Sequence, residues 1–143
     1  MTVIVLDTNV IVSALVSSGG PPAELVRRWE AGEFEVVTSE ALVDEFERVL
    51  QYSRVKKYLK SRDEAQVLLN SLKKVTQRSS GEVVEVLTKD ISDNRLLECA
   101  VAGKAKYIVT GDDQVVELKS YKGITILNPA EFLAVLGKGR SAG

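Results

Sequence analysis

Acidic residues that follow the apolar runs of this chain have the spacing best suited to chemistry. Asp7 directly follows the first apolar run, Asp112 follows a later run after one glycine, and Asp93 begins a helical stretch. Carboxylates that meet at one place repel each other unless a cation compensates their charge. Hard divalent cations bound by carboxylate oxygens supply that compensation. Three such carboxylates therefore predict a site for Mg²⁺ or Mn²⁺.

The residue types that are missing narrow this chemistry further. The 143 residues include no histidine and a single cysteine, Cys99. Ser-His-Asp and Cys-His catalysis, His-ligated zinc and a disulfide framework are therefore excluded. Any metal must be held by oxygen ligands. We interpret Cys99, which lies on an apolar helical face, as a buried thiol that fits a reducing, cytoplasmic setting.

The elements that must position the acids are short apolar runs that alternate with helical stretches. Strands are predicted over 3–6, 35–38, 83–87, 107–110 and 124–127, and helices over 10–16, 21–31, 40–52, 62–77, 93–102 and 129–136. Ser39 and Ser61 suit helix N-caps, and Gly103 suits a helix end. Strands that alternate with helices predict one α/β domain over 1–136, a three-layer α/β/α fold with a mainly parallel central sheet. Residues 137–143 are expected to be a disordered tail.

In a fold of this kind, the three acids are expected to lie close together. Ligands of an open parallel sheet bind beyond the carboxyl ends of its strands, where Asp7, Asp93 and Asp112 are expected. Each acid also has a purely structural interpretation. Asp7 can cap a helix, Asp93 can complement a helix dipole, and Asp112 with Asp113 can form a turn. These separate structural roles would explain each acid alone, but not why all three are expected at the same edge of the sheet.

A fourth acid is expected from the helix over 40–52. Its apolar face consists of Leu42, Val43, Phe46, Val49 and Leu50. Glu45 and Glu47 both lie about 100° from the centre of that face, on opposite sides, at roughly 100° per residue. Periodicity does not choose between them, and a solvated acidic flank is the alternative for both.

Basic residues gather between 54 and 78, although the whole chain has a net charge of −1 from 19 basic and 20 acidic residues. This stretch holds eight basic residues and two acidic ones, a local excess of six positive charges. Lysine and arginine bind phosphates whatever the base sequence. We predict that RNA is held here by Arg54, Lys56, Lys57, Lys60, Lys73 and Lys74. A solvated helical surface is the alternative.

Four segments, taken in order, resemble the motifs of PIN-domain ribonucleases. They are VLDTNV over 5–10, SEALVDEF over 39–46, DISDN over 90–94 and VTGDD over 109–113. The similarity is closest to VapC-like toxin components of prokaryotic toxin–antitoxin systems and extends from about Thr2 to Leu136. One departure is visible, because Ile91 and Ser92 replace the middle pair of the Asp-Pro-Asp-Asp that is frequent in this branch.

The resemblance implies roles for individual residues. The four catalytic acids and metal ligands would be Asp7, Glu45, Asp93 and Asp112, so the resemblance selects Glu45 over Glu47. Asp113 would be an additional ligand, and the supporting polar residues would be Thr8, Asn9 and Thr110. The implied activity is Mg²⁺- or Mn²⁺-dependent hydrolysis of RNA phosphodiester bonds that leaves a 5′-phosphate. The implied partners are a second copy of the chain and a small antitoxin protein.

Two other functions are compatible with parts of the pattern. A non-catalytic RNA- or partner-binding domain would share the fold, although all four acids are present. A Mg²⁺-dependent phosphatase of the haloacid-dehalogenase type would need Asp-x-Asp at the first motif, where Asn9 stands. We also expect a cytoplasmic protein without membrane attachment, because the N-terminus lacks a secretory pattern and no apolar run reaches 18 residues. The stripes Leu25, Val26, Trp29 with Phe34, and Val67, Leu68, Leu72 are predicted to be core rather than partner surface.

Overall fold

The computed structural model describes the backbone of residues 1–77 and 91–141 and the side chains of residues 1–75 and 94–137. The strand predicted over 83–87 lies outside the described residues. Within the described ranges, none of the helices combines the length and the apolar character that a membrane crossing requires.

Six strands of the described residues form one sheet in the order β3-β2-β1-β4-β6-β5. Four of them were predicted and run parallel to one another: β1 (Val3–Leu6), β2 (Glu35–Ser39), β4 (Tyr107–Val109) and β6 (Ile124–Leu127). The short β3 (Thr76–Gln77) continues the parallel sheet beside β2, and β5 (Ser120–Tyr121) pairs antiparallel with β6. At the centre, Val5 of β1 lies between Val37 of β2 and Ile108 of β4. The mainly parallel sheet is confirmed.

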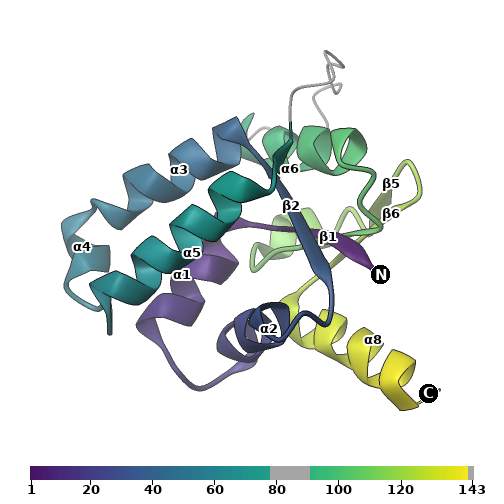
Figure 1. The fold of residues 1–143 in the computed structure, drawn as a ribbon. Coiled ribbons are helices and arrows are strands. Elements are labelled where there is room, and N and C mark those ends of the chain that lie inside the picture. The colour runs from purple at the N-terminus through teal and green to yellow at the C-terminus, as the bar shows by residue number, and fades with distance from the viewer. Residues whose placement is uncertain (78–90, 142–143) are drawn as a thin grey trace.

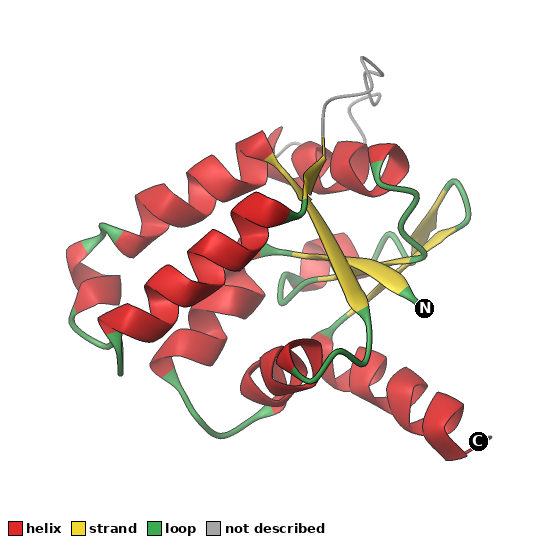
Figure 2. Cartoon of the chain, viewed as in Figure 1, coloured by secondary structure: helices red, strands yellow, loops and turns green. Residues whose placement is uncertain are grey.

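Helices cover both faces of this sheet, as Figures 1 and 2 show. Their bounds are α1 Thr8–Val16, α2 Pro21–Glu30, α3 Glu40–Leu50, α4 Ser53–Lys56, α5 Arg62–Lys74, α6 Ile91–Ala102, α7 Asp113–Val116 and α8 Pro129–Ser141. Along β1, Ile4 and Leu6 belong to an apolar cluster with α1, α2, α3, α5 and α8, whereas Val5 belongs to a second cluster with α6 and α7. Alternate residues of a strand face opposite sides of the sheet. The two clusters therefore confirm three layers, α/β/α.

Several boundaries differ from those predicted. Helix α5 ends at Lys74 rather than near residue 77, because Thr76 and Gln77 pair with Thr38 and Ser39 as β3. The one-turn helices α4 and α7 were not predicted, since four residues are too short to show a helical period. Helix α8 runs to Ser141 where a tail was expected after residue 136.

The predicted helix caps form. The Ser39 hydroxyl accepts a hydrogen bond from the backbone N–H of Leu42 at 3.3 Å, and that of Ser61 accepts one from Glu64 at 3.1 Å. The Cys99 thiol of α6 is buried as predicted, and burial raises its pKa to about 12. In α8, Phe132 is fully buried and its ring lies edge-on to Phe34, with ring centroids 5.3 Å apart. This contact anchors α8 beneath the sheet.

Helix α6 ends at Gly103, as predicted, but for a different reason. The residue with a left-handed backbone is Lys104, with φ of 54°, and not the glycine. The N–H of Ala105 donates to Ala100 O at 2.9 Å, which completes a Schellman-type end around Lys104. A Cβ at Gly103 would lie 2.7 Å from Cγ2 of Val37 on β2. Glycine is needed at 103 because the helix end approaches β2 closely.

Two neighbouring substitutions should therefore have opposite effects on stability. Gly103→Ala forces the helix away from Val37 and should lower the free energy of unfolding by about 1–3 kcal/mol. Lys104→Gly removes the left-handed strain of an exposed side chain and should raise it by about 1 kcal/mol. Urea unfolding followed by circular dichroism measures both. An alanine variant at 103 as stable as the unmodified protein would contradict the close approach.

Candidate active site

A cavity of about 450 Å³ lies where β1 and β4 end and α1, α3 and α6 approach one another. The described residues that line it are Asp7, Thr8, Asn9, Val12, Ser13, Glu45, Val49, Arg54, Val55, Leu96 and Asp112. Three of the four predicted acids, Asp7, Glu45 and Asp112, thus share one cavity at the carboxyl edge of the sheet. This edge is the expected ligand site of an open parallel sheet.

Asp7 is the most deeply placed of these acids. Its N–H donates to Val109 O at 2.9 Å, which continues the pairing of β1 with β4. It occupies the N-cap position of α1. Its Oδ2 accepts a hydrogen bond of 2.7 Å from the fully buried hydroxyl of Thr110. The carboxylate therefore links the start of α1 to the residue that follows β4, in addition to its place at the helix N-terminus.

The surroundings of Asp7 disfavour its negative charge. The pKa of this carboxyl rises from its ordinary value of 3.8 to about 6, and burial is the largest cause. The hydrogen bond from Thr110 lowers the pKa, the nearby charge of Glu45 raises it, and the N–H groups of Asn9 and Thr8 lower it. Burial and repulsion thus outweigh the hydrogen bonds. A cation in the cavity would relieve both effects.

Glu45 and Glu47, which the helical period leaves equivalent, are separated by the structure. Glu45 lines the cavity, and its Oε2 lies 3.5 Å from the donor hydroxyl of Thr8. Glu47 lies outside the cavity, and its Oε1 pairs with Nζ of Lys73 at 3.1 Å. That pair lines a separate surface depression with Glu40, Val43 and Asp44. Glu45 is therefore the acid that α3 brings to Asp7.

Asp112 combines a structural and a site position. Its Oδ1 accepts a hydrogen bond of 2.9 Å from the N–H of Gln114 and so caps α7, where the structural interpretation expected a turn. The same residue lines the cavity. Its own N–H donates to the Thr110 hydroxyl at 3.1 Å, so one threonine ties Asp7 to Asp112. Asp113, the first residue of α7, is not among the described residues that line the cavity.

The two remaining polar residues of the first motif hold the edge together. Asn9 accepts a hydrogen bond of 3.1 Å from the N–H of Gly111, which joins α1 to the loop after β4. The hydroxyl of Thr8 reaches toward Glu45, as described above. Ser13 also lines the cavity and was not predicted. Its position four residues after Asn9 puts both on one face of α1, which is the signal that could have identified it.

Asp93 lies in the first turn of α6, and its side chain lies outside the described residues. Leu96, one turn further along α6, lines the cavity, so this end of the helix borders the site. Among the residues whose side chains are described, no group of three acids, cysteines or histidines is close enough to hold a metal ion. The described donor set, three carboxylates with hydroxyl and amide groups, is nevertheless all oxygen, which fits Mg²⁺ or Mn²⁺.

The predicted basic residues are dispersed. Arg54 of α4 is the one basic residue among the described residues that line the cavity. Lys56, Lys57 and Lys60 are exposed on the same segment, between α3 and α5. Lys73 forms the ion pair with Glu47, and Lys74 lines a different cavity. The structure therefore places only Arg54 directly at the acids.

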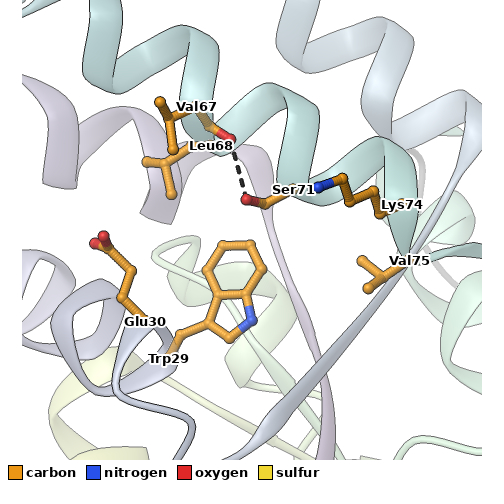
Figure 3. A pocket seen from close by; sticks show the side chains of 7 residues that line it. All are labelled: Trp29, Glu30, Val67, Leu68, Ser71, Lys74 and Val75. Carbon is orange, nitrogen blue, oxygen red and sulfur yellow. Dashed lines mark hydrogen bonds between the residues drawn. The ribbon is translucent and has the colours of Figure 1, made fainter.

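That second cavity, of about 270 Å³, lies between α2 and α5 (Figure 3). Trp29 and Glu30 of α2 face Val67, Leu68, Ser71 and Lys74 of α5, with Val75 beside them. Of the two apolar stripes, Leu25, Val26, Phe34, Leu68 and Leu72 are buried as predicted. Trp29 is half-buried and Val67 is 57% exposed, so the stripes are core except at this rim.

Removing the Asp7 charge should stabilise the metal-free protein. Above pH 6 the buried carboxylate is ionised against its environment, so Asp7→Asn should raise the free energy of unfolding by up to about 3 kcal/mol at pH 7.5. The folded protein holds this proton more tightly than the unfolded chain, so the contribution of Asp7 to wild-type stability falls as the pH rises from about 4 to 6. The gain from Asp7→Asn should accordingly be small at pH 4.

Urea unfolding in EDTA at several pH values measures this difference. Glu47→Gln is the matched control, because Glu47 lies in an exposed ion pair outside the cavity, and its effect should stay within about 0.5 kcal/mol. A change in the free energy of unfolding by Asp7→Asn that is the same at pH 4 and pH 7.5 would contradict the burial of an ionised group.

Comparison with known proteins matches this architecture to a family. A protein from Methanocaldococcus jannaschii, named uncharacterized protein MJ1680, is 25% identical over 116 residues, which cover 81% of this chain and 74% of that protein. Residues 3–114 match the family described as PIN domain, a span that includes Asp7, Glu45, Asp93 and Asp112. PIN domains are generally nucleases, which places the chain in a hydrolase class, and they typically use divalent metals. The chain belongs to the PIN-domain family.

Proposed function

We propose that this protein is a divalent-metal-dependent endoribonuclease that hydrolyses RNA phosphodiester bonds. The observation that carries the proposal is the meeting of Asp7, Glu45 and Asp112 in one cavity, with Arg54 at its lining. The three acids could hold a metal ion, and the positive charge of Arg54 could hold the RNA, a polyanion, against that metal. Membership of a generally nucleolytic family supports the same reaction class.

The metal ligands in this proposal are Asp7, Glu45, Asp93 and Asp112, with Asp113 as an additional candidate. The buried carboxylate of Asp7, whose pKa is raised, and the all-oxygen donor set fit Mg²⁺ or Mn²⁺. When bound, such a cation supplies Lewis acidity that makes the hydrolytic water more acidic and neutralises charge on the phosphate.

The chain's own residues would orient the acids and bind the RNA. Thr110 donates a hydrogen bond to one oxygen of Asp7 and so would orient its carboxylate at the cavity. Asn9 and Thr8 hold the Gly111 loop and Glu45 in place. Arg54 would bind a phosphate of the RNA, with Lys56, Lys57 and Lys60 along the same segment extending the contact. Lys73 and Lys74 have less support, since they line other cavities.

The finer assignment extends this proposal. The order and spacing of the four motifs support a VapC-like toxin, with a small antitoxin protein as partner and a homodimer as the assembly. A small antitoxin-like reading frame beside this one would support the pairing.

Cleavage of RNA should require both the metal and the acids. Purified protein should cut RNA with Mg²⁺ or Mn²⁺ and not with EDTA. Asp7→Asn and Asp112→Asn should each reduce cleavage at least about a thousandfold while the fold, followed by circular dichroism, is retained. Glu47→Gln, outside the cavity, should cleave like wild type. Gel analysis of a labelled RNA measures all four proteins.

Other results of this assay would contradict the proposal or support a different function. Full activity of either aspartate variant would refute the site. Binding of RNA without cleavage would identify a non-catalytic domain, and release of phosphate from a small monoester would identify a phosphatase.

Binding of RNA should weaken with salt, and Arg54 should account for part of that dependence. Neutralising one phosphate contact reduces the slope of log affinity against log salt by about one. Arg54→Met should reduce both the affinity and this slope. Lys104→Gly removes an equal charge far from the cavity and should leave the slope unchanged. Fluorescence anisotropy between about 50 and 200 mM salt tests the pair. Equal slopes for wild type and Arg54→Met would contradict the contact.

A further inference from the structure

The segment between α3 and α5 exposes two tyrosines beside basic residues. Tyr52 is 38% exposed and Tyr58 is 59% exposed. The guanidinium of Arg54 lies 5.5 Å from the ring centroid of Tyr52, and the ammonium of Lys57 lies 5.6 Å from that of Tyr58. Neither tyrosine belongs to the apolar clusters that the described residues form. Packing of the core therefore does not explain them.

The backbone of Tyr52 is held beside residues that line the acidic cavity. Its N–H donates to Val49 O at 3.0 Å, and its carbonyl accepts from the N–H of Val55 at 2.9 Å. Val49, Val55 and Arg54 all line the cavity. Three residues of the cavity wall thus contact Tyr52, and the cation over its ring is the one that faces the acids.

Aromatic side chains exposed beside cations suit unpaired nucleotides. Bases of a single strand stack on aromatic rings, while the neighbouring cation binds the phosphate. Bases in a duplex are already stacked inside the helix and do not offer their faces. Stacking is also uncharged, so the acids of the cavity do not oppose it. A ring and a guanidinium together can hold one nucleotide by both its base and its phosphate.

We propose that Tyr52 stacks on an unpaired base of the RNA whose phosphate Arg54 binds. This inference rests on the ribonuclease function proposed above and adds a substrate-binding residue to it. The ring of Tyr52 acts on binding; the acids alone serve the hydrolysis.

Binding to a single strand that contains 2-aminopurine tests the stacking directly, because the fluorescence of this base is quenched when it stacks. The probe is an eight-nucleotide RNA, with Mg²⁺ and an Asp7→Asn background to prevent cleavage, and with wild type in EDTA as a second background. Tyr52→Leu should lose the quenching and weaken binding at least about fivefold. Tyr52→Phe keeps the ring and should retain both within about twofold.

Tyr58→Leu is the matched control. Tyr58 carries the same ring-and-cation arrangement, but Lys57 is not among the described residues that line the cavity. Its loss should change the quenching and the affinity less than twofold.

Several results would overturn the proposal: unchanged quenching with Tyr52→Leu, equal losses with Tyr58→Leu, or no binding in either background. The binding assay needs no cleavage, so the two proposals can fail separately. Stacking that depends on Tyr52 in a protein that never cleaves RNA would refute the ribonuclease function alone. Cleavage that Tyr52→Leu leaves unaltered in rate would refute the stacking alone.

Discussion

The constraint on which the rest of the site depends is the burial of the Asp7 carboxylate at the end of the central strand. Strand β1 is covered on both faces, so the residue that ends it emerges between two apolar layers. The carboxyl is buried there, and the pKa of Asp7 rises to about 6 mainly for this reason. An ionised carboxylate in that position is unfavourable for folding and favourable for a cation. At Asp7, the ionised carboxylate that the proposed chemistry needs therefore lowers the stability of the domain.

The loops around Asp7 are held so that this unfavourable charge stays in place. The Thr110 hydroxyl donates to Asp7 and accepts from the N–H of Asp112, so one buried side chain fixes two acids from adjacent strand ends. Asn9 ties the same loop to α1 through Gly111. The hydrogen bond from Thr110 lowers the pKa of Asp7 less than burial raises it. The polar network therefore orients the carboxylate without neutralising it, which leaves its charge available to a metal.

The sequence predicted the parts of this arrangement that repeat or that end a strand. Apolar runs with β-branched residues located β1, β2, β4 and β6, and strand ends located Asp7 and Asp112. Glu45 could not be distinguished from Glu47 by helical period, because both lie at equal angles from the apolar face. The difference arises from tertiary packing, since α1 meets one flank of α3 and α5 meets the other, where Lys73 pairs with Glu47.

The sequence held no signal for the shorter elements of the fold. The strand β3 exists because β2 offers it a pairing edge, and α4 and α7 are single turns. The sequence predicted that α6 ends at Gly103, but it held no signal for the left-handed backbone at Lys104. The contact with Val37, which only the folded structure shows, accounts for that glycine.

The arrangement of charge around the cavity explains why its rim needs more than basic residues. Asp7, Glu45 and Asp112 repel a phosphate at short range, and Arg54 alone among the described lining residues opposes them. Attraction by the outer lysines is weakened by salt, whereas contact between an aromatic ring and a base is not electrostatic in origin. Tyr52 supplies such a contact beside Arg54. A strand bound by both would be held at the acids under conditions in which charge alone would release it.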